Sequence, residues 1–456
     1  MSFENLMRAF ESGALRPRGG MEAYYEGRAR VAALGVSLPP KARVLEVQAP
    51  WAKMAIDVLT EVLIPSGFIT SCEEDQEPIG WVERTWQHND MDSQFNLAAS
   101  EALATGAAFW VLSPPDEESE YPYVRALDSK HACVRTDWQG RLLEGLAVYR
   151  VDADTVGATY YLPDGVIFYK RQEGGEWLTD GSGRLDSWGP SIIPMYNRAR
   201  IKDKYGRSEL TEMATIIDAA SRTLTNIQVG QEVAAWPLRL LIGNHSAEIL
   251  DSMPDTMQAY IGNILAAPEG SDIKQLTGVD MTPIQNIYKL YALQISSMTG
   301  IPPSMMGVSA DSNPTSAEAL RVAKDRLIAR AENKQRQFAD SLERIARTVC
   351  VMGGFDLVEP TALEVQWRDA AAPSVSAMMA SALQAQAQGV LSAQTARDFM
   401  MLSPQQRERE DARSQEVDEM AGAGVADRSA PEDPDDEDDE AQETEETEKP
   451  KKESRD

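Results

Sequence analysis

The pattern of apolar and polar positions divides the chain into helical and extended regions. Residues 1–70 read as helical, and one stretch within them is clear. Its apolar positions recur at the helical period: Trp51, Met54, Val58, Leu59 and Val62. The Pro65-Ser66-Gly67 tripeptide then ends the helix. A further helix, "SEALATG", breaks at Gly106 and gives way to a short strand, Phe109–Leu112.

Residues 121–190 show a different pattern, with alternating side chains and frequent turn residues. Segments such as "LAVYRVD" and "TYYLPDGVIFYKR" predict short strands joined by Asp-Gly and Gly-Ser turns. This region is therefore expected to form a β-containing module.

From Ser208 the helical period returns. Ser208 is the predicted N-cap of a long helix that Pro237 ends, with Glu209 and Glu212 in its first turn. "LRLLIGN" then predicts a buried strand, residues 245–281 a compact insert, and "PIQNIYKLYALQISSMTG" another helix that Gly300 closes.

The longest predicted helix follows a loop rich in proline and glycine. Thr315 and Glu318 have the spacing of a capping box, so the helix is expected to start there. Its apolar stripe comprises Leu320, Ala323, Leu327, Ala331, Phe338, Leu342, Ile345 and Val349. A strand is predicted at Leu363–Trp367, followed by two short helices at 373–388 and 393–400 that Gly389 separates.

Charge changes the interpretation of both the tail and the whole chain. The net charge of the 456 residues is −28, and residues 431–456 alone carry 14 acidic and 4 basic residues. Such a tail cannot bury enough apolar surface to order itself. A protein that grips nucleic acid neutralises phosphates with Lys and Arg. This chain is not built to grip DNA, although it could enclose DNA without holding it.

The remaining composition predicts a soluble protein made in the cytoplasm. No apolar run approaches the ~18 residues of a membrane span, and the N-terminus lacks the apolar segment of a signal peptide. The three cysteines, Cys72, Cys133 and Cys350, are scattered and are expected to be small buried residues without disulfides or metal.

Few residues carry recognisable chemistry. His131 lies near Asp128 and Cys133, but a surface histidine at a strand end is the favoured interpretation. The "DGSGR" segment at 180–184 resembles a phosphate loop, yet it lacks the full motif and is expected to be a hairpin turn. Asp90 and Asp92 could ligate a metal in a nuclease or hydrolase, although such pairs are common by chance.

Basic residues follow the longest helix and interleave with acids. They are Arg321, Lys324, Arg326, Arg330, Lys334, Arg336, Arg344 and Arg347. Asp340 and Arg344 are four positions apart, as are Glu343 and Arg347, so each pair can meet on the helix surface. A solvated face with salt bridges or subunit contacts is favoured over a cationic rim beside DNA.

The order of several motifs resembles the portal proteins of tailed bacteriophages, of the type found in long-tailed phages with actinobacterial hosts. The matching segments cover residues 20 to 410 and include "YYEGRARV", "WAKMAIDVLTEVLIPSGF", "WQHNDMDSQFNLAASEALATGAAFWVL" and "LEVQWRD". Two are the most specific: "IPMYNRARIKDKYGRSEL" and "TGIPPSMMG…NPTSAEALRVAKDRL". Each motif alone is weak, whereas the ordered set is specific.

The resemblance implies an α+β, mainly helical portal fold with named parts. The wing would span 1–207, the stem helices 208–236 and 282–299, and the clip 237–281. The tunnel loop would span 300–315, the long helix and a returning wing strand 316–371, and the crown 372–412. Residues 413–456 would be a disordered acidic tail, which departs from any fixed family pattern.

The resemblance also implies a function without catalysis and without a cofactor or metal. Portals form rings, typically dodecamers, at one capsid vertex of the virion. The implied partners are further copies of the chain, the major capsid protein, the terminase large subunit, a head–tail adaptor and double-stranded DNA in transit, with no membrane. Assembly is expected in the host bacterial cytoplasm. A minor capsid or head-completion protein is the alternative.

The tunnel loop supplies the predicted site. The residues expected to face the DNA channel are Ser304, Met305, Met306, Gly307, Val308, Ser309, Ala310, Asp311, Ser312 and Asn313. They include one acid and no base, which suits steric contact with DNA. Arg321, Lys324 and Arg326 are expected near the DNA. A packed connection between helices, with Met305 and Met306 as core filler, remains the alternative.

Overall fold

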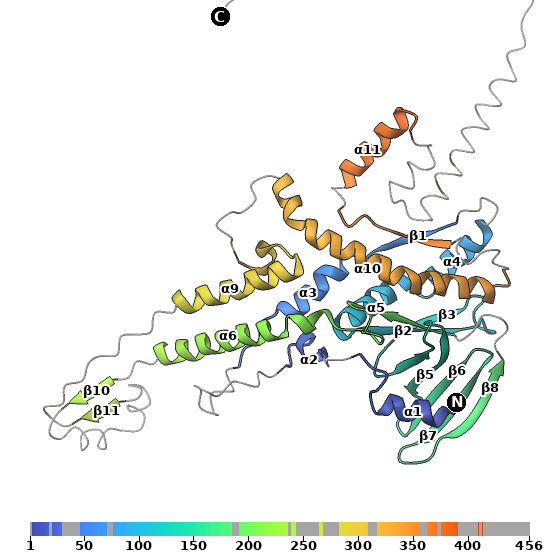
Figure 1. The fold of residues 1–456 in the computed structure, drawn as a ribbon, viewed down its shortest axis with the longest axis horizontal. Helices are drawn as coiled ribbons and strands as arrows, with labels where there is room; N and C mark the ends of the chain where they lie inside the picture. Colours follow the sequence, from blue (N-terminus) through green and yellow to red (C-terminus); the bar gives the residue numbers. More distant parts are fainter. Residues whose placement is uncertain are drawn as a thin grey trace, which may run out of the picture. The chain divides into compact units, whose positions relative to one another are not determined.

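A computed structural model of the chain describes most of its folded elements (Figure 1). The described residues are 2–17, 21–29, 46–70, 76–184, 191–235, 239–242, 264–267, 282–308, 317–355, 363–371 and 375–390, with 409 and 413. The chain divides into two units, Met1–Ala372 and Pro373–Asp456. The second unit contributes helix α11 (Val375–Ala387). The predicted helix at 393–400 and nearly all of the acidic tail lie outside the described residues.

The first unit mixes helices and strands, so "mainly helical" holds only in part. Its helices are α1 (Phe3–Glu11), α2 (Glu22–Tyr25), α3 (Trp51–Thr60), α4 (Gln76–His88), α5 (Met91–Thr105), α6 (Ala214–Ala235), α9 (Thr282–Thr299) and α10 (Ala317–Met352). Two 3-10 turns, η2 (Glu209–Glu212) and η3 (Pro303–Met306), precede α6 and follow α9.

The β-module predicted between residues 121 and 190 is confirmed. An antiparallel five-stranded sheet runs in chain order through β4 (Ala132–Thr136), β5 (Leu142–Arg150), β6 (Thr155–Leu162), β7 (Gly165–Gln172) and β8 (Leu178–Arg184). The segment 180–184 is not the predicted hairpin turn, since it lies inside β8 and pairs with β7. Its glycines suggested a turn, but β8 is the edge strand of the sheet, where glycines are tolerated.

A second sheet links this module to the helices. It has the order β3-β2-β9, formed by β3 (Tyr123–Asp128), β2 (Ala107–Ser113) and β9 (Ile192–Tyr196). The predicted break at Gly106 is confirmed, because this residue ends α5 with a φ of 115° and β2 begins next. The strand is longer than the predicted Phe109–Leu112.

One strand was predicted wrongly as the end of a helical region. Residues Pro65–Thr70 form β1, which pairs antiparallel with β12 (Leu363–Trp367). The sequence itself is a poor strand signal, since it starts with Pro-Ser-Gly. Its partner lies about 300 positions away, so the hydrogen bonds that define it cannot be read locally. The predicted strand at Leu363–Trp367 is confirmed.

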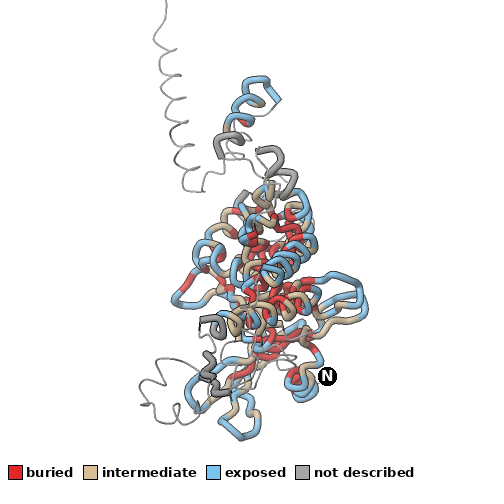
Figure 2. Tube along the Cα trace, turned by 90° about the vertical axis from the view of Figure 1, so that its left-hand side faces the viewer, coloured by how far each residue is buried: buried red, intermediate tan, exposed pale blue. Residues whose placement is uncertain are grey.

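The core of the first unit gathers around α5 and α10. Buried positions lie in the interior, with exposed residues outside them (Figure 2). Helix α5 buries Phe95, Ala99 and Leu103, four positions apart, against β2 and β3. Helix α10 buries Leu327, Phe338 and Leu342 of its predicted stripe. The N-terminal α1 forms a separate cluster with the five-stranded sheet, where Phe3 stacks on Tyr169.

Helices α6 and α9 lie side by side (Figure 1). The predicted N-cap at Ser208 is confirmed, because its side chain accepts the Leu210 N–H at 3.0 Å. The cap opens the 3-10 turn η2, which continues into α6. The region between α6 and α9 contributes two short parallel strands, β10 (Arg239–Ile242) and β11 (Ile264–Ala267). The rest of this insert lies outside the described residues.

Candidate functional site

The predicted tunnel loop begins where α9 ends against α10. Gly300 has a φ of 76°, a conformation that costs other residues free energy. A side chain here would also meet α10, because an added Cβ would lie 2.9 Å from the Leu327 backbone nitrogen. Ser296 Oγ donates to the Ile301 carbonyl at 2.6 Å, and Thr299 Oγ1 accepts the Ile301 N–H. The chain therefore leaves α9 in a fixed direction.

A buried cluster of charges lies directly beneath this exit. Glu209 receives two cations from α10: Lys334 Nζ at 2.6 Å from Oε1 and Arg330 Nη2 at 2.6 Å from Oε2. Lys334, which is 6% exposed, also donates to Asn197 Oδ1 at 2.6 Å. Arg330 Nη1 donates to the Thr299 carbonyl, the last of α9. We call these four residues, Asn197, Glu209, Arg330 and Lys334, the junction.

The charges of the junction set the protonation state of Glu209. Burial alone would raise the pKa of this carboxyl, since it disfavours the charged form. The Lys334 ammonium and the Arg330 guanidinium outweigh burial and lower the pKa of Glu209 to about 2. Glu209 is therefore a carboxylate at neutral pH, and each of its oxygens accepts a charged hydrogen bond.

The junction joins segments that are far apart in the sequence. Asn197 follows β9, and its Nδ2 donates to the Arg207 carbonyl at 2.7 Å and to Glu209 Oε1 at 3.1 Å. Glu209 begins the turn that leads into α6, whereas Arg330 reaches the end of α9. The cluster therefore fixes the base of the loop relative to α6, α10 and the three-stranded sheet.

The predicted channel residues divide into anchored and exposed ones. Met306 and Val308 are buried in the main core, whereas Ser304, Met305 and Gly307 are exposed. Met305 is 42% exposed, so only one residue of the Met pair fills the core. The other predicted residues, Ser309, Ala310, Asp311, Ser312 and Asn313, lie outside the described part of the chain, as does the predicted cap at Thr315.

The predicted DNA-proximal bases lie on the first turns of α10. Lys324 is half-buried and Arg326 is exposed. The backbone of Arg321 is helical, but its side chain lies outside the described part of the structure. Gly300 lies against the backbone of Arg326 and Leu327, so Arg326 adjoins the start of the loop.

Sequence reasoning missed the role of Arg330 and Lys334, which it assigned to a solvated helix face. A signal existed, because Lys334 lies three positions after Ala331 and four before Phe338, within the apolar stripe. A cation in such a stripe requires a buried anion. The anion, Glu209, lies 121 positions before Arg330 and still farther before Lys334, so the sequence could not name it.

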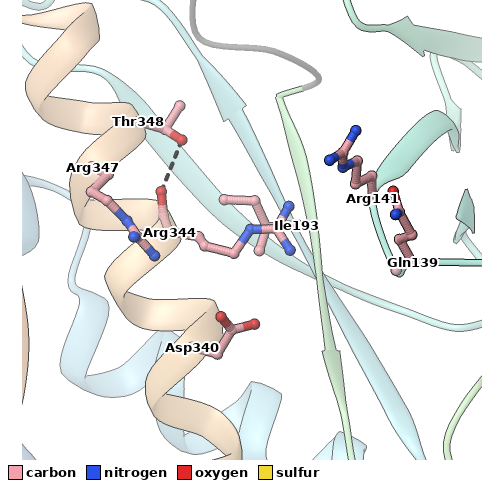
Figure 3. Close-up of a pocket in the computed structure, with 8 residues that line it drawn as sticks. Gln139, Arg141, Ile193, Asp340, Arg344, Arg347 and Thr348 are labelled. Carbon is pink, nitrogen blue, oxygen red and sulfur yellow. Dashed lines mark hydrogen bonds between the residues drawn. The ribbon is translucent and has the colours of Figure 1, made fainter. Parts of the chain in front are cut away.

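A second feature of α10 is a hollow beside its C-terminal half (Figure 3). It has a volume of about 470 Å³ and is lined by Gln139, Gly140, Arg141, Ile193, Asp340, Arg344, Arg347 and Thr348. The expected pairing of Asp340 with Arg344 is wrong, since no ion pair joins these two described residues. Arg347 Nε donates to the Glu343 backbone carbonyl at 3.2 Å.

The alternative catalytic candidates do not assemble into a site. Asp92 accepts the Trp86 indole N–H at 2.8 Å, and Asp90 has a left-handed backbone at the start of α5. His131 Nδ1 lies 2.7 Å from Asp128 Oδ1 at the surface, while burial raises the pKa of the Cys133 thiol to about 12. Among the residues that the structure describes, no group of three or more His, Cys, Asp or Glu could hold a metal ion.

None of the described helices is both long and apolar enough to cross a bilayer.

Comparisons with known proteins match most of the chain. The family described as "Phage portal protein, SPP1 Gp6-like" matches residues 20–421. The portal proteins of Mycobacterium phage D29 and Mycobacterium phage L5 are each 30% identical to the chain, over 431 and 432 residues. Both matches cover 89% of this chain and 86% of the relative.

Solved structures give more distant similarities. A chain from the neck of a native gene transfer agent particle has a TM-score of 0.45 and 17% identity, covering 88% of this chain and 100% of that chain. A chain from the neck of the empty particle has a TM-score of 0.44 and 17% identity, covering 82% and 98%.

Proposed function

The chain belongs to the SPP1 Gp6-like family of phage portal proteins, and from this premise we propose that it forms a closed ring at one vertex of a phage capsid. The genome would enter and leave through the ring axis. Portal proteins are structural, so the chain is a virion component and not an enzyme. Twelve copies are the proposed number, assembled in the host cytoplasm.

One observation carries the ring proposal: the exposed apolar flank of α9. Its inner face is already occupied, since Ala292 and Ile295 are buried and Tyr288 stacks on Trp51. A second flank carries Ile287, Leu290 and Leu293, which are 45%, 51% and 42% exposed. Apolar patches that the single chain leaves uncovered mark interaction surfaces. In a ring of identical copies, the neighbouring subunit covers this flank.

The family parts map onto the described elements as follows. Residues 1–207 with β12 would be the wing, α6 and α9 the stem, and β10 with β11 part of the clip. The loop 300–315 would be the tunnel loop, α10 the long helix, and α11 part of the crown. The terminase large subunit and then a head–tail adaptor would dock at the clip, and the major capsid protein would surround the ring.

The tunnel loop would touch DNA without binding it tightly. Its exposed residues in the described part are Ser304, Met305 and Gly307, and none of them is charged. Residues 309–313 would continue the same surface, with Asp311 as the one charge. Each Lys or Arg contact to phosphate adds salt-dependent affinity that would stall a sliding duplex. Arg321, Lys324 and Arg326 would therefore adjoin the loop as a short cationic rim at its base.

Electron microscopy of the purified protein tests the proposal. Rings with a central hole and projecting wings are expected, whereas a monomer or dimer under all assembly conditions contradicts it. A filter-binding titration adds a second measurement, in which the ring retains linear duplex only weakly at about 150 mM salt. Tight retention would contradict the proposal of a non-adhesive channel.

A substitution in the α9 flank tests the observation that carries the ring. Leu290→Glu places a charge where a neighbour should pack, and it is expected to abolish rings while leaving the chain folded. Leu178→Glu is the matched control, because Leu178 is 69% exposed on β8, away from the stem. Sedimentation velocity measures both. If Leu290→Glu still forms normal rings, α9 does not supply the contact.

A further inference from the structure

The hollow beside α10 has an unbalanced charge. Arg141, Arg344 and Arg347 bring three guanidinium groups to its walls, and Asp340 brings the one carboxylate among its eight lining residues. Arg344 extends from α10 across Ile193, while Arg141 projects from the opposite wall (Figure 3). Neither forms an ion pair with a described residue. Arg347 is engaged elsewhere, since its Nε donates to the Glu343 carbonyl. Arg141 and Arg344 therefore face the single carboxylate of Asp340, in a chain whose net charge is −28.

Asp340, the one acid of the lining, forms no ion pair with Arg141 or Arg344. Asp137 Oδ1, in the turn that carries Arg141, accepts the Arg141 backbone N–H at 2.8 Å. The buried Ile193 side chain forms an apolar wall. Arg141 and Arg344 line the same hollow without an ion-pair partner among the described residues, so an anionic ligand there would gain charged hydrogen bonds.

Carboxylates fit the hollow better than DNA does. The planar fork of Arg matches a carboxylate in a bidentate pair. A duplex, in contrast, needs cations along a track of phosphates, whereas the hollow offers a few arginines beside one carboxylate in a chain of net charge −28. A volume of about 470 Å³ accommodates a few side chains of a protein segment.

The chain itself presents such a segment at the turn between β2 and β3. Residues 116–120, which we call the acidic turn, include the exposed Glu117, Glu118 and Glu120. No ion pair is found for these three described side chains. The turn is ordered, because Asp116 Oδ1 accepts the N–H groups of Glu118 and Ser119. An ordered segment loses little conformational entropy on binding.

The acidic turn and the hollow lie on different sides of α10. Ser119 Oγ lies 2.9 Å from His88 Nε2 at the end of α4, so α4 holds the turn. Helix α4 packs on α10 through Trp81, whose indole N–H donates to the Val349 carbonyl at 3.1 Å. At 3.6 residues per turn, Val349 lies about 140° around the helix from Arg344. A head-to-tail contact between copies joins two such different surfaces.

We propose that the acidic turn of one subunit enters the hollow of the next, where its glutamates pair with Arg141 and Arg344. The inference rests on the proposed ring and adds to it a charge-based contact between neighbouring subunits. This contact is distinct from the apolar flank of α9. It also gives a role to Arg141 and Arg344, neither of which forms an ion pair with a described residue.

Charge exchange in the full-length protein tests this pairing. Arg141→Glu with Arg344→Glu reverses the hollow, and Glu117→Arg with Glu118→Arg reverses the turn. Each double variant is expected to raise the protein concentration for half-assembly about tenfold, consistent with the coupling of close interfacial charge pairs. The quadruple variant should restore assembly to within about threefold of the unmodified chain. Arg150→Glu with Arg336→Glu is the control, since both residues are exposed outside the hollow.

Each outcome separates this inference from the proposed function. Sedimentation and electron microscopy report assembly, and circular dichroism confirms that each variant is folded. Unchanged assembly of both double variants overturns the inference but leaves the ring intact. Loss in the hollow variant without rescue in the quadruple variant overturns the pairing, because another carboxylate then occupies the hollow. If the hollow variant assembles normally but loses duplex binding, the hollow is a nucleic-acid site, and the inference is overturned. Absence of rings from the unmodified chain contradicts the proposed function itself.

Discussion

The two halves of α10 carry similar cations in opposite circumstances. In the first half, Arg330 and Lys334 are paired with Glu209 inside the chain at 2.6 Å. In the second half, Arg344 lines an open hollow and forms no ion pair with a described residue. The cations of the two halves are of the same kind and lie on the same helix. The difference lies in what the rest of the fold brings to each position.

This contrast separates cations that stabilise the subunit from cations available to a partner. A buried cation without an anion costs several kcal/mol, so Lys334 depends on Glu209, and the half-buried Arg330 depends on it in part. A half-exposed guanidinium is hydrated and costs little without a partner. The first pair therefore fixes the base of the loop, whereas Arg344 is free to respond to assembly.

Removal of Glu209 is expected to have the largest effect on the free energy of unfolding. A small effect would remove the contrast between the two halves of α10. Glu209→Ala leaves the buried Lys334 ammonium and the half-buried Arg330 guanidinium without their anion, and the free energy of unfolding should fall by about 3–5 kcal/mol. Urea denaturation, at a concentration where sedimentation shows an unchanged assembly state, measures the loss. Glu209→Gln is the matched variant, because it keeps the volume and some hydrogen bonds and should lose less. A loss below about 1 kcal/mol for Glu209→Ala would show that the junction does not stabilise the subunit.

Acid titration is the second test. The pKa of Glu209 is lowered in the folded chain to about 2 from the usual value of 4.5. Its stabilisation is therefore complete above the unfolded pKa and is lost as the pH falls from about 4.5 toward 2. The expected contribution is about 3 kcal/mol. The difference in unfolding free energy between the unmodified chain and Glu209→Gln should shrink across this window. A constant difference from pH 6 to pH 2.5 would contradict the lowered pKa.

The fold was predictable where local chemistry sets it. The cap at Ser208 needs only the Leu210 N–H two residues on, and the end of α5 at Gly106 needs only a residue that tolerates a positive φ. The strand β1 was missed because its partner, β12, lies far along the chain. The β8 segment was misread because glycines are as compatible with an exposed edge strand as with a turn.

The same limit applies to the candidate site. The position of the loop followed from its proline and glycine residues, and the structure places Ser304 to Val308 at the end of α9. The junction depends on Glu209 and Arg330, which meet only because η2 and α10 pack together. The hollow depends on Arg141 and Arg344, from two segments about 200 positions apart. Spacing along a helix suggested Asp340 as the partner of Arg344, but side-chain direction decided otherwise.

Alanine substitutions at the two glycines of the loop are expected to reduce the stability by an intermediate amount. Gly300 and Gly307 have nearly equal φ angles, 76° and 72°. An added Cβ at Gly300 would meet the Leu327 nitrogen at 2.9 Å, whereas at Gly307 nothing lies within 4 Å. Gly307→Ala should cost about 1–2 kcal/mol for the backbone alone, and Gly300→Ala about 1 kcal/mol more, because the loop base must move. Thermal unfolding compares the two. Equal losses would show that the exit from α9 is not held against α10.

Removal of charge from the hollow should have the smallest effect. Arg344→Met keeps most of the aliphatic stem over Ile193 and removes only the guanidinium group. The free energy of unfolding of the unassembled chain is expected to change by less than about 0.5 kcal/mol, with a slight gain at low salt as repulsion is relieved. About 1 M salt should remove that gain, since the screening length falls to about 3 Å. Arg330→Met is the matched change in the junction and should cost about 1.5–3 kcal/mol, because the charged hydrogen bonds to Glu209 and Thr299 are lost. If Arg344→Met destabilises the chain as much as Arg330→Met does, Arg344 serves the fold of the subunit, and the hollow is not kept for a partner.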